Sequence, residues 1–129
     1  RIRAFIAPEI ILPAGGQGAI GIELRANDHI TQRLIAPLHH TETAARVECE
    51  RALNRHLHGG CQVPIAAYAI KHGEELWLRA LVGDPEGRNM LRAEATASSD
   101  SAESLGIRVA EELLSLGADR ILAAVYANG

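Results

Sequence analysis

The sequence predicts an α+β fold, in which a three-stranded antiparallel sheet carries helices on one face. Between residues 65 and 96, three runs of residues read as strands, and the clearest of them alternates two sets of side chains with the strand period of two. Turns rich in glycine and proline separate these runs, and short connections of this kind join antiparallel neighbours. Apolar residues recur at helical spacing both before and after the runs. A chain of 129 residues is long enough to bury one core against such a sheet.

Residues 1–40 offer few elements of their own. Residues 2–6 are expected to form a short strand, which Pro8 ends because proline has no backbone N–H to donate. The stretch PAGGQG at residues 13–18 is expected to be a hinge or a tight turn. It lacks the glycine–lysine spacing of a phosphate-binding loop and the acidic residue of a dinucleotide-binding fingerprint. Residues 19–24 alternate enough to form a strand.

Two helices are expected next. Asn27 or Asp28 caps a short helix that runs through Ala36, where Pro37 prevents clean continuation. Thr41 caps a longer helix that leads to Leu57. Its apolar face and its solvated, ion-paired face both follow from spacings of three and four residues. The first face is Cys49, Leu53 and Leu57, and the second is Glu42, Arg46, Glu48, Glu50 and Arg51.

Gly59 is expected to end the longer helix, because glycine readily adopts the left-handed conformation found just past helix ends. Gly60 then leaves the backbone beside Cys61 unshielded, and Pro64 prevents an immediate restart of helix. Cys61 is therefore expected on a short, exposed turn between a helix and a strand. Nearby cationic side chains favour its thiolate, whereas the negative end of the helix disfavours an anion. The residues alone thus leave open an accessible, reactive thiol or a small buried hydrophobe.

The three strands are expected at residues 65–71, 75–82 and about 91–96. In the second strand, one face holds Leu76, Leu78, Ala80 and Val82, and the other holds Trp77, Arg79 and Leu81. The third strand alternates small apolar residues with charged ones, so one of its faces is wet. A lone tryptophan on a strand is typical of core or domain-contact surface, and we assign Trp77 no catalytic role.

Two helices are expected after the sheet. Asp100 and Glu103 form a capping pair for the first of them, and Gly117 terminates it. The apolar stripe of this helix is Ala102, Leu105, Val109, Leu113 and Leu116. Residues 119–126 form a final short helix.

Several function classes are excluded at this point. A net charge of −3 with interspersed signs gives no electrostatic footprint for nucleic acid. No segment reads as a signal peptide or a membrane span. His39 and His40 are adjacent on a loop, where neighbours rarely face one ion, so no metal site is predicted. Helix geometry puts Cys49 on the order of 12 Å or more from the turn that carries Cys61, beyond disulfide reach. Both cysteines are expected to be reduced thiols of a cytoplasmic protein.

Two long stretches carry a resemblance. Residues 50–69, ERALNRHLHGGCQVPIAAYA, are followed at residues 75–87 by ELWLRALVGDPEG, and residues 12–25 read LPAGGQGAIGIELR. The first region is similar to the cofactor-attachment region of the porphobilinogen deaminase (hydroxymethylbilane synthase) family, and the second resembles its hinge segment. The resemblance implies the C-terminal part of a longer enzyme. We therefore expect residues 1–40 to be a hinge and crossover segment of its N-terminal domains, and residues 41–129 to be a C-terminal cofactor-anchoring domain.

The resemblance also implies a chemistry, a transferase that joins four porphobilinogen units into hydroxymethylbilane with release of ammonia, in haem (tetrapyrrole) biosynthesis. Cys61 would hold a dipyrromethane cofactor through a thioether, beside Gly59 and Gly60, as an anchor rather than as the turnover nucleophile. Arg51 matches an arginine near the pyrrole chain, where its planar fork suits carboxylates. Gln17 of the hinge loop is a second candidate contact.

The expected partners are porphobilinogen, the growing pyrrole chain and the N-terminal domains. The family's catalytic aspartate and most of its substrate-binding arginines match no position in this chain. We therefore expect the chain alone to be inactive, to lack the cofactor when expressed by itself, and to self-associate, whereas the intact enzyme is expected to be a monomer. Two other interpretations stay open. One is a non-catalytic α+β domain that uses its exposed cysteine for partner contact or redox sensing, and the other is a structural domain with an inert Cys61.

Overall fold

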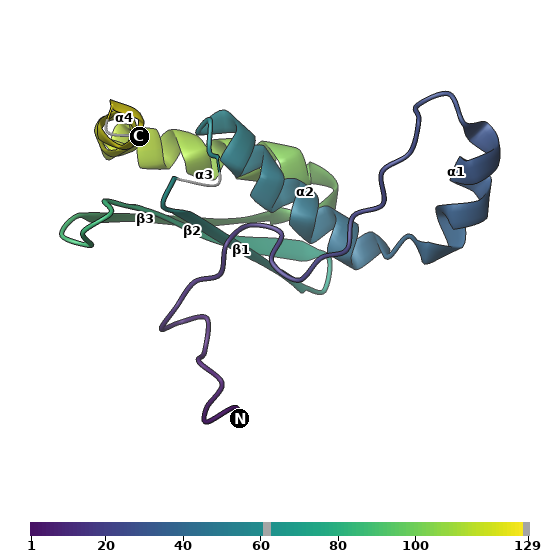
Figure 1. The fold of residues 1–129 in the computed structure, drawn as a ribbon, viewed down its shortest axis with the longest axis horizontal. Coiled ribbons are helices and arrows are strands. Elements are labelled where there is room, and N and C mark those ends of the chain that lie inside the picture. Colours follow the sequence, from purple (N-terminus) through teal and green to yellow (C-terminus); the bar gives the residue numbers. More distant parts are fainter. Residues whose placement is uncertain (61–62, 128–129) are drawn as a thin grey trace.

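The computed structural model describes residues 1–60 and 63–127. Its helices are α1 (His29–Ile35), α2 (Thr41–His56), α3 (Ala102–Ser115) and α4 (Ala118–Ala127), with short 3₁₀ turns at Ala36–Leu38 and Ser99–Ser101. Its strands are β1 (Ile65–His72), β2 (Glu75–Gly83) and β3 (Met90–Ser98), paired antiparallel in the order β1-β2-β3. Helices α2 and α3 lie over one face of the sheet, and α4 follows at one end (Figure 1). This arrangement confirms the predicted α+β fold.

The sheet follows the alternation read from the sequence. All four residues of the predicted inner face of β2 are buried: Leu76, Leu78, Ala80 and Val82. The predicted turns are present, since Gly73 and Gly87 both have positive φ. The Asp84 side chain accepts hydrogen bonds from the backbone N–H groups of Glu86, Arg88 and Asn89, which closes the second turn. Each strand lies within about two residues of its expected bounds, the usual uncertainty of element ends.

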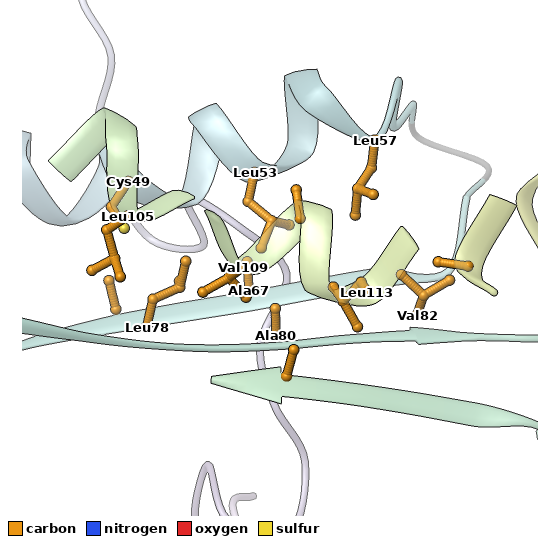
Figure 2. Close-up of a cluster of buried hydrophobic side chains, with 14 of the residues drawn as sticks. Cys49, Leu53, Leu57, Ala67, Leu78, Ala80, Val82, Leu105, Val109 and Leu113 are labelled. Atoms are coloured by element: carbon orange, nitrogen blue, oxygen red, sulfur yellow. The ribbon is translucent and has the colours of Figure 1, made fainter. Parts of the chain in front are cut away.

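The core lies between the sheet and its helical cover (Figure 2). In Figure 2, α2 contributes Cys49, Leu53 and Leu57, α3 contributes Leu105, Val109 and Leu113, and the sheet contributes Ala67, Leu78, Ala80 and Val82. Leu116 is the exception to the predicted stripe of α3. It is 51% exposed because it caps the end of the helix, just before Gly117 turns the chain with φ 100°.

Two predicted strands are not formed. Residues 2–6 and 19–24 have no regular secondary structure, and the described part of the chain gives neither a neighbouring strand to pair with. Extended segments become strands only through ladder hydrogen bonds, so alternation alone was an insufficient indication. The expected short helix is confirmed as α1, and Asp28 is its cap, with Oδ1 accepting from the Thr31 N–H at 3.0 Å. Pro37 lies in the 3₁₀ turn that follows.

Three helix-end predictions are also wrong. His40, rather than Thr41, is the N-cap of α2, because its Nδ1 accepts the Thr43 N–H. His58, rather than Gly59, takes the left-handed conformation after α2, with φ 53°. The predicted pair of Asp100 and Glu103 does not cap α3, whose N-cap residue is Ser101. Sequence patterns place helices well, but several polar residues near an end compete for the cap.

Residues 1–40 carry most of the exposed large apolar side chains of the described chain. These are Ile2, Phe5, Ile6, Ile10, Ile11, Ile20, Ile22, Ile30, Leu34 and Leu38. Figure 1 shows the N-terminal tail and the part that carries α1 extending away from the sheet and its helices, whereas the stretch between them passes beside β1. Among the described helices, none combines the length and the apolar character that crossing a membrane requires.

Candidate functional site

The turn after α2 is shaped by its own helix and by a strained residue. Leu57 caps α2, and the His58 N–H donates to the Arg55 carbonyl at 3.0 Å. The Gly59 N–H then reaches back to the Asn54 carbonyl at 2.8 Å, and Asn54 Nδ2 donates to the Gly59 carbonyl at 3.2 Å. Asn54 thus bonds both the N–H and the carbonyl of Gly59, the first residue of the Gly-Gly sequence.

Gly59 is required by this close approach. A Cβ added there would lie 2.2 Å from Asn54 Oδ1 and 2.8 Å from Ile65 Cδ1, well inside normal contact. Gly60 is different, because a Cβ at that position meets nothing within 4 Å. The predicted pair therefore divides into one glycine that permits packing and one that leaves open space. Cys61, predicted on an exposed turn here, lies outside the described residues.

Arg51 lies on α2, two turns before this point, and it is exposed. It lines a groove of about 920 Å³ together with Asn54, the glycine-rich loop and the residues that precede α2. Within the described residues, no hydrogen bond or ion pair holds the Arg51 guanidinium. Asn54 lines this groove and also bonds Gly59, so the groove adjoins the turn. Asn54 thus links the groove that Arg51 lines to Gly59, which does not itself line the groove.

Gln17 is placed differently. It is exposed on the glycine-rich turn, where its N–H donates to the Ala14 carbonyl. Its side chain lines a smaller hollow of about 220 Å³ with Arg46, Glu50 and Tyr68. Arg51 borders the larger groove and not this hollow, whereas the loop residue Gly16 borders both.

Glu50 is a site residue that the pattern of charges concealed. It was assigned to a solvated, ion-paired face, yet it is only 5% exposed. Oε1 accepts the Ala69 N–H at 2.7 Å, and Oε2 accepts the Gly16 N–H at 2.6 Å. Burial raises the pKa of this carboxyl above 4.5, although the two backbone donors act in the opposite direction. One carboxylate therefore fastens the glycine-rich loop to β1, and no spacing rule would have found it.

The other cysteine is chemically quiet. Cys49 is fully buried in the core, and burial, reinforced by the charges of Glu50 and Glu48, raises the pKa of its thiol to about 12. A thiol in that state is neither a nucleophile nor a metal ligand at neutral pH. Over the part of the chain that the structure describes, no three His, Cys, Asp or Glu side chains converge on a metal position. His40 caps a helix instead.

The sequence around this turn matches a known protein family. A family model described as the porphobilinogen deaminase C-terminal domain matches residues 44–115, more than half of the chain. The chain belongs to this family. The match begins in α2, spans the Gly-Gly-Cys sequence and the sheet, and ends with α3. The hinge loop, α1 and α4 lie outside the matched range. Porphobilinogen deaminase is a transferase of porphyrin biosynthesis, and the matched residues correspond to its C-terminal domain.

Proposed function

We propose that this chain anchors the dipyrromethane cofactor of a porphobilinogen deaminase through a thioether to Cys61. The intact enzyme would then join four porphobilinogen units into hydroxymethylbilane with release of ammonia. The observation that carries this proposal is the family match across the Gly-Gly-Cys sequence. The proposal extends to a location in the cytoplasm and to a monomeric intact enzyme.

The residues present fit the cofactor. A dipyrromethane of this kind carries several carboxylates, and the groove beside the turn offers Arg51, a cation with no competing partner among the described residues. A Cβ added at Gly60 would meet nothing within 4 Å, so the turn is open at this residue. Asn54 fixes the turn at the end of the groove. When bound, the cofactor supplies a free pyrrole position at which the chain is extended.

Each residue then has a separate task. Cys61 supplies the sulfur that fixes one end of the pyrrole chain. Arg51 pairs with its carboxylates, which orients the rings along the groove, because a guanidinium binds a carboxylate through two parallel hydrogen bonds. Gly59 lets Asn54 pack against the turn. Gln17 contributes a neutral amide from the hinge loop. The proton transfers of the reaction are assigned to the N-terminal domains.

The chain expressed alone tests this division of tasks. We expect its intact mass to show no adduct, one thiol to react with an alkylating reagent under native conditions, and no conversion of porphobilinogen. Enzymes lower barriers by at least about 8 kcal/mol, more than one tether and one arginine supply. Cys49 is the internal control, since its buried thiol reacts only after unfolding. Turnover by this chain, or a cofactor-sized adduct on Cys61, would refute the division.

Arg51→Leu in an enzyme that contains this chain tests the groove. We expect slower pyrrole-chain elongation, by about tenfold or more for a lost charge-assisted contact, with the cofactor still bound by mass. Arg55→Leu is the matched control, because Arg55 lies on the same helix but pairs with Glu103 at 3.5 Å beside another groove. Equal effects of the two substitutions would contradict the assignment.

Loss of the adduct in Cys61→Ala, but not in Cys49→Ala, separates the anchor from the redox-sensing and inert alternatives.

A further inference from the structure

The last helix of the chain holds the turn that precedes Cys61. The Tyr126 hydroxyl, near the end of α4, donates a hydrogen bond to the backbone carbonyl of His58. The two residues are 68 positions apart in sequence. Tyr126 also lines the groove between the ends of α2 and α4, together with Leu57 and Leu122.

The residue that Tyr126 holds is the strained one. Among the described residues, His58 is the one non-glycine residue with positive φ, at 53°. A histidine in this region is less stable than in the right-handed region, so the surrounding contacts must maintain it. The other hydrogen bonds of His58 and Gly59 are with Asn54 and Arg55 of α2 itself. Among the described residues, Tyr126 is the hydrogen-bond partner that ties His58 to a separate element.

Helix α4 is itself fixed to the core. Ala118 is fully buried and Leu122 is 5% exposed, both within the cluster beneath the sheet's helical cover. The Tyr126 hydroxyl on this helix therefore holds the His58 carbonyl at a fixed place relative to the core, one residue before the Gly-Gly sequence. Helix α4 lies beyond the matched residues 44–115, so this contact is a feature of the chain's own C-terminal part.

We propose that Tyr126 is a positioning residue for the cofactor anchor, which acts by fixing the left-handed conformation of His58 immediately before the Gly-Gly-Cys sequence. The role in positioning the anchor rests on the proposed function, but the effect of Tyr126 on the turn can be tested without it. Amide exchange at Gly59 measures the opening of the turn, whereas intact mass measures whether Cys61 carries the cofactor. The turn could thus be held by Tyr126 even if Cys61 carried no cofactor, and the reverse.

Tyr126→Phe in the full 129-residue chain is the test, because it removes the hydroxyl and keeps the ring. We expect hydrogen exchange at the Gly59 amide to rise by about fivefold, the effect of one net hydrogen bond. The thermal midpoint should fall by only a few degrees, because one hydrogen bond is lost, and exchange in β2 should follow this small change in global stability. The alkylation rate of Cys61 should rise with Gly59 exchange, since both follow the same turn. Tyr68→Phe is the matched control, because the Tyr68 ring lies on the sheet beside Arg46 and Arg79.

Three outcomes would overturn the inference. The first is unchanged Gly59 exchange in Tyr126→Phe. The second is an equal rise of Gly59 exchange in Tyr68→Phe, because that pattern reports general loosening rather than a local tether. The third is faster Gly59 exchange with no change in Cys61 alkylation, which would separate the turn from the anchor.

Discussion

Glu50 shows how one buried side chain can substitute for a missing strand. β1 is an edge strand, and an edge exposes backbone groups that need partners. Glu50 accepts the Ala69 N–H, and Arg46 Nε donates to the Ala69 carbonyl at 2.7 Å. The Ala67 N–H donates to the Pro13 carbonyl at 3.1 Å. Two side chains of α2 and one carbonyl of the hinge segment thus cover the edge.

Glu50→Ala is expected to lower the free energy of unfolding by about 2 kcal/mol at pH 7, because it leaves the buried Ala69 N–H without an acceptor. It should also speed exchange of the Gly16 amide. Glu48→Ala is the matched control, since Glu48 lies on the same helix and is exposed. Urea unfolding and amide exchange measure the two effects. Equal destabilisation by both substitutions would count against the role given to Glu50.

The pH dependence of Glu50 has a definite sign. Burial raises its pKa in the folded chain above 4.5, so the folded state binds the proton more readily than the unfolded state. Its titration therefore contributes most stability below pH 4.5, and that contribution is lost as pH rises through the folded pKa. As pH rises from below 4.5 through the folded pKa of Glu50, the difference in free energy of unfolding between the wild type and Glu50→Ala should accordingly become smaller.

At the scale of elements, α2 and α3 meet at a glycine. A Cβ on Gly106 would lie 2.3 Å from the Cys49 carbonyl oxygen and 2.8 Å from the Ala52 Cβ. The partner atoms are backbone and a short side chain, which cannot rotate away. The buried face of α3 therefore depends on this position having no side chain. Glycine in a helix interior otherwise weakens the helix, so its presence here reflects packing.

Gly106→Ala reverses the usual sign of this substitution. In an open helix position it would stabilise by about 1 kcal/mol, whereas here overpacking is expected to destabilise by about 2 kcal/mol. Thermal or urea unfolding measures the difference. Gly21→Ala is the control, because its Cβ meets nothing within 4 Å. A gain in stability for Gly106→Ala would show that the helices separate easily.

The elements that could be predicted are those fixed by periodicity. β2 and α3 show their buried faces in the spacing of their own apolar residues, so their neighbours need not be known. Residues 19–24 could become a strand only by pairing with a neighbouring strand, and local alternation does not show whether such a neighbour exists. Glu50 and Tyr126 were missed for the same reason. Their roles come from contacts with Gly16 and His58, which are distant in sequence.

At the scale of the whole molecule, two parts differ in how they are held. Residues 1–40 expose their large apolar side chains and contribute none to the core cluster of the described chain. They are held to the rest of the chain by polar contacts. These are hydrogen bonds from the Gly16 N–H to Glu50 and from the Ala67 N–H to the Pro13 carbonyl, and an ion pair between Glu9 and Arg79 at 2.9 Å. We therefore propose a domain boundary near residue 40, with the exposed apolar surface of the first part facing the N-terminal domains of the enzyme.

A chain of residues 41–129 is expected to fold without residues 1–40, because every residue of the core cluster lies after residue 40. Its unfolding should stay cooperative but occur at lower denaturant, since the Ala67 N–H and the Glu50 carboxylate each lose a partner. In the full chain, exchange should be faster at residues 19–24 than in β2. The measurement requires a verified monomer, because self-association through the exposed apolar side chains would protect the early segment. Equal protection of the two regions in a monomer, or an unfolded shortened chain, would show that the first part belongs to the domain.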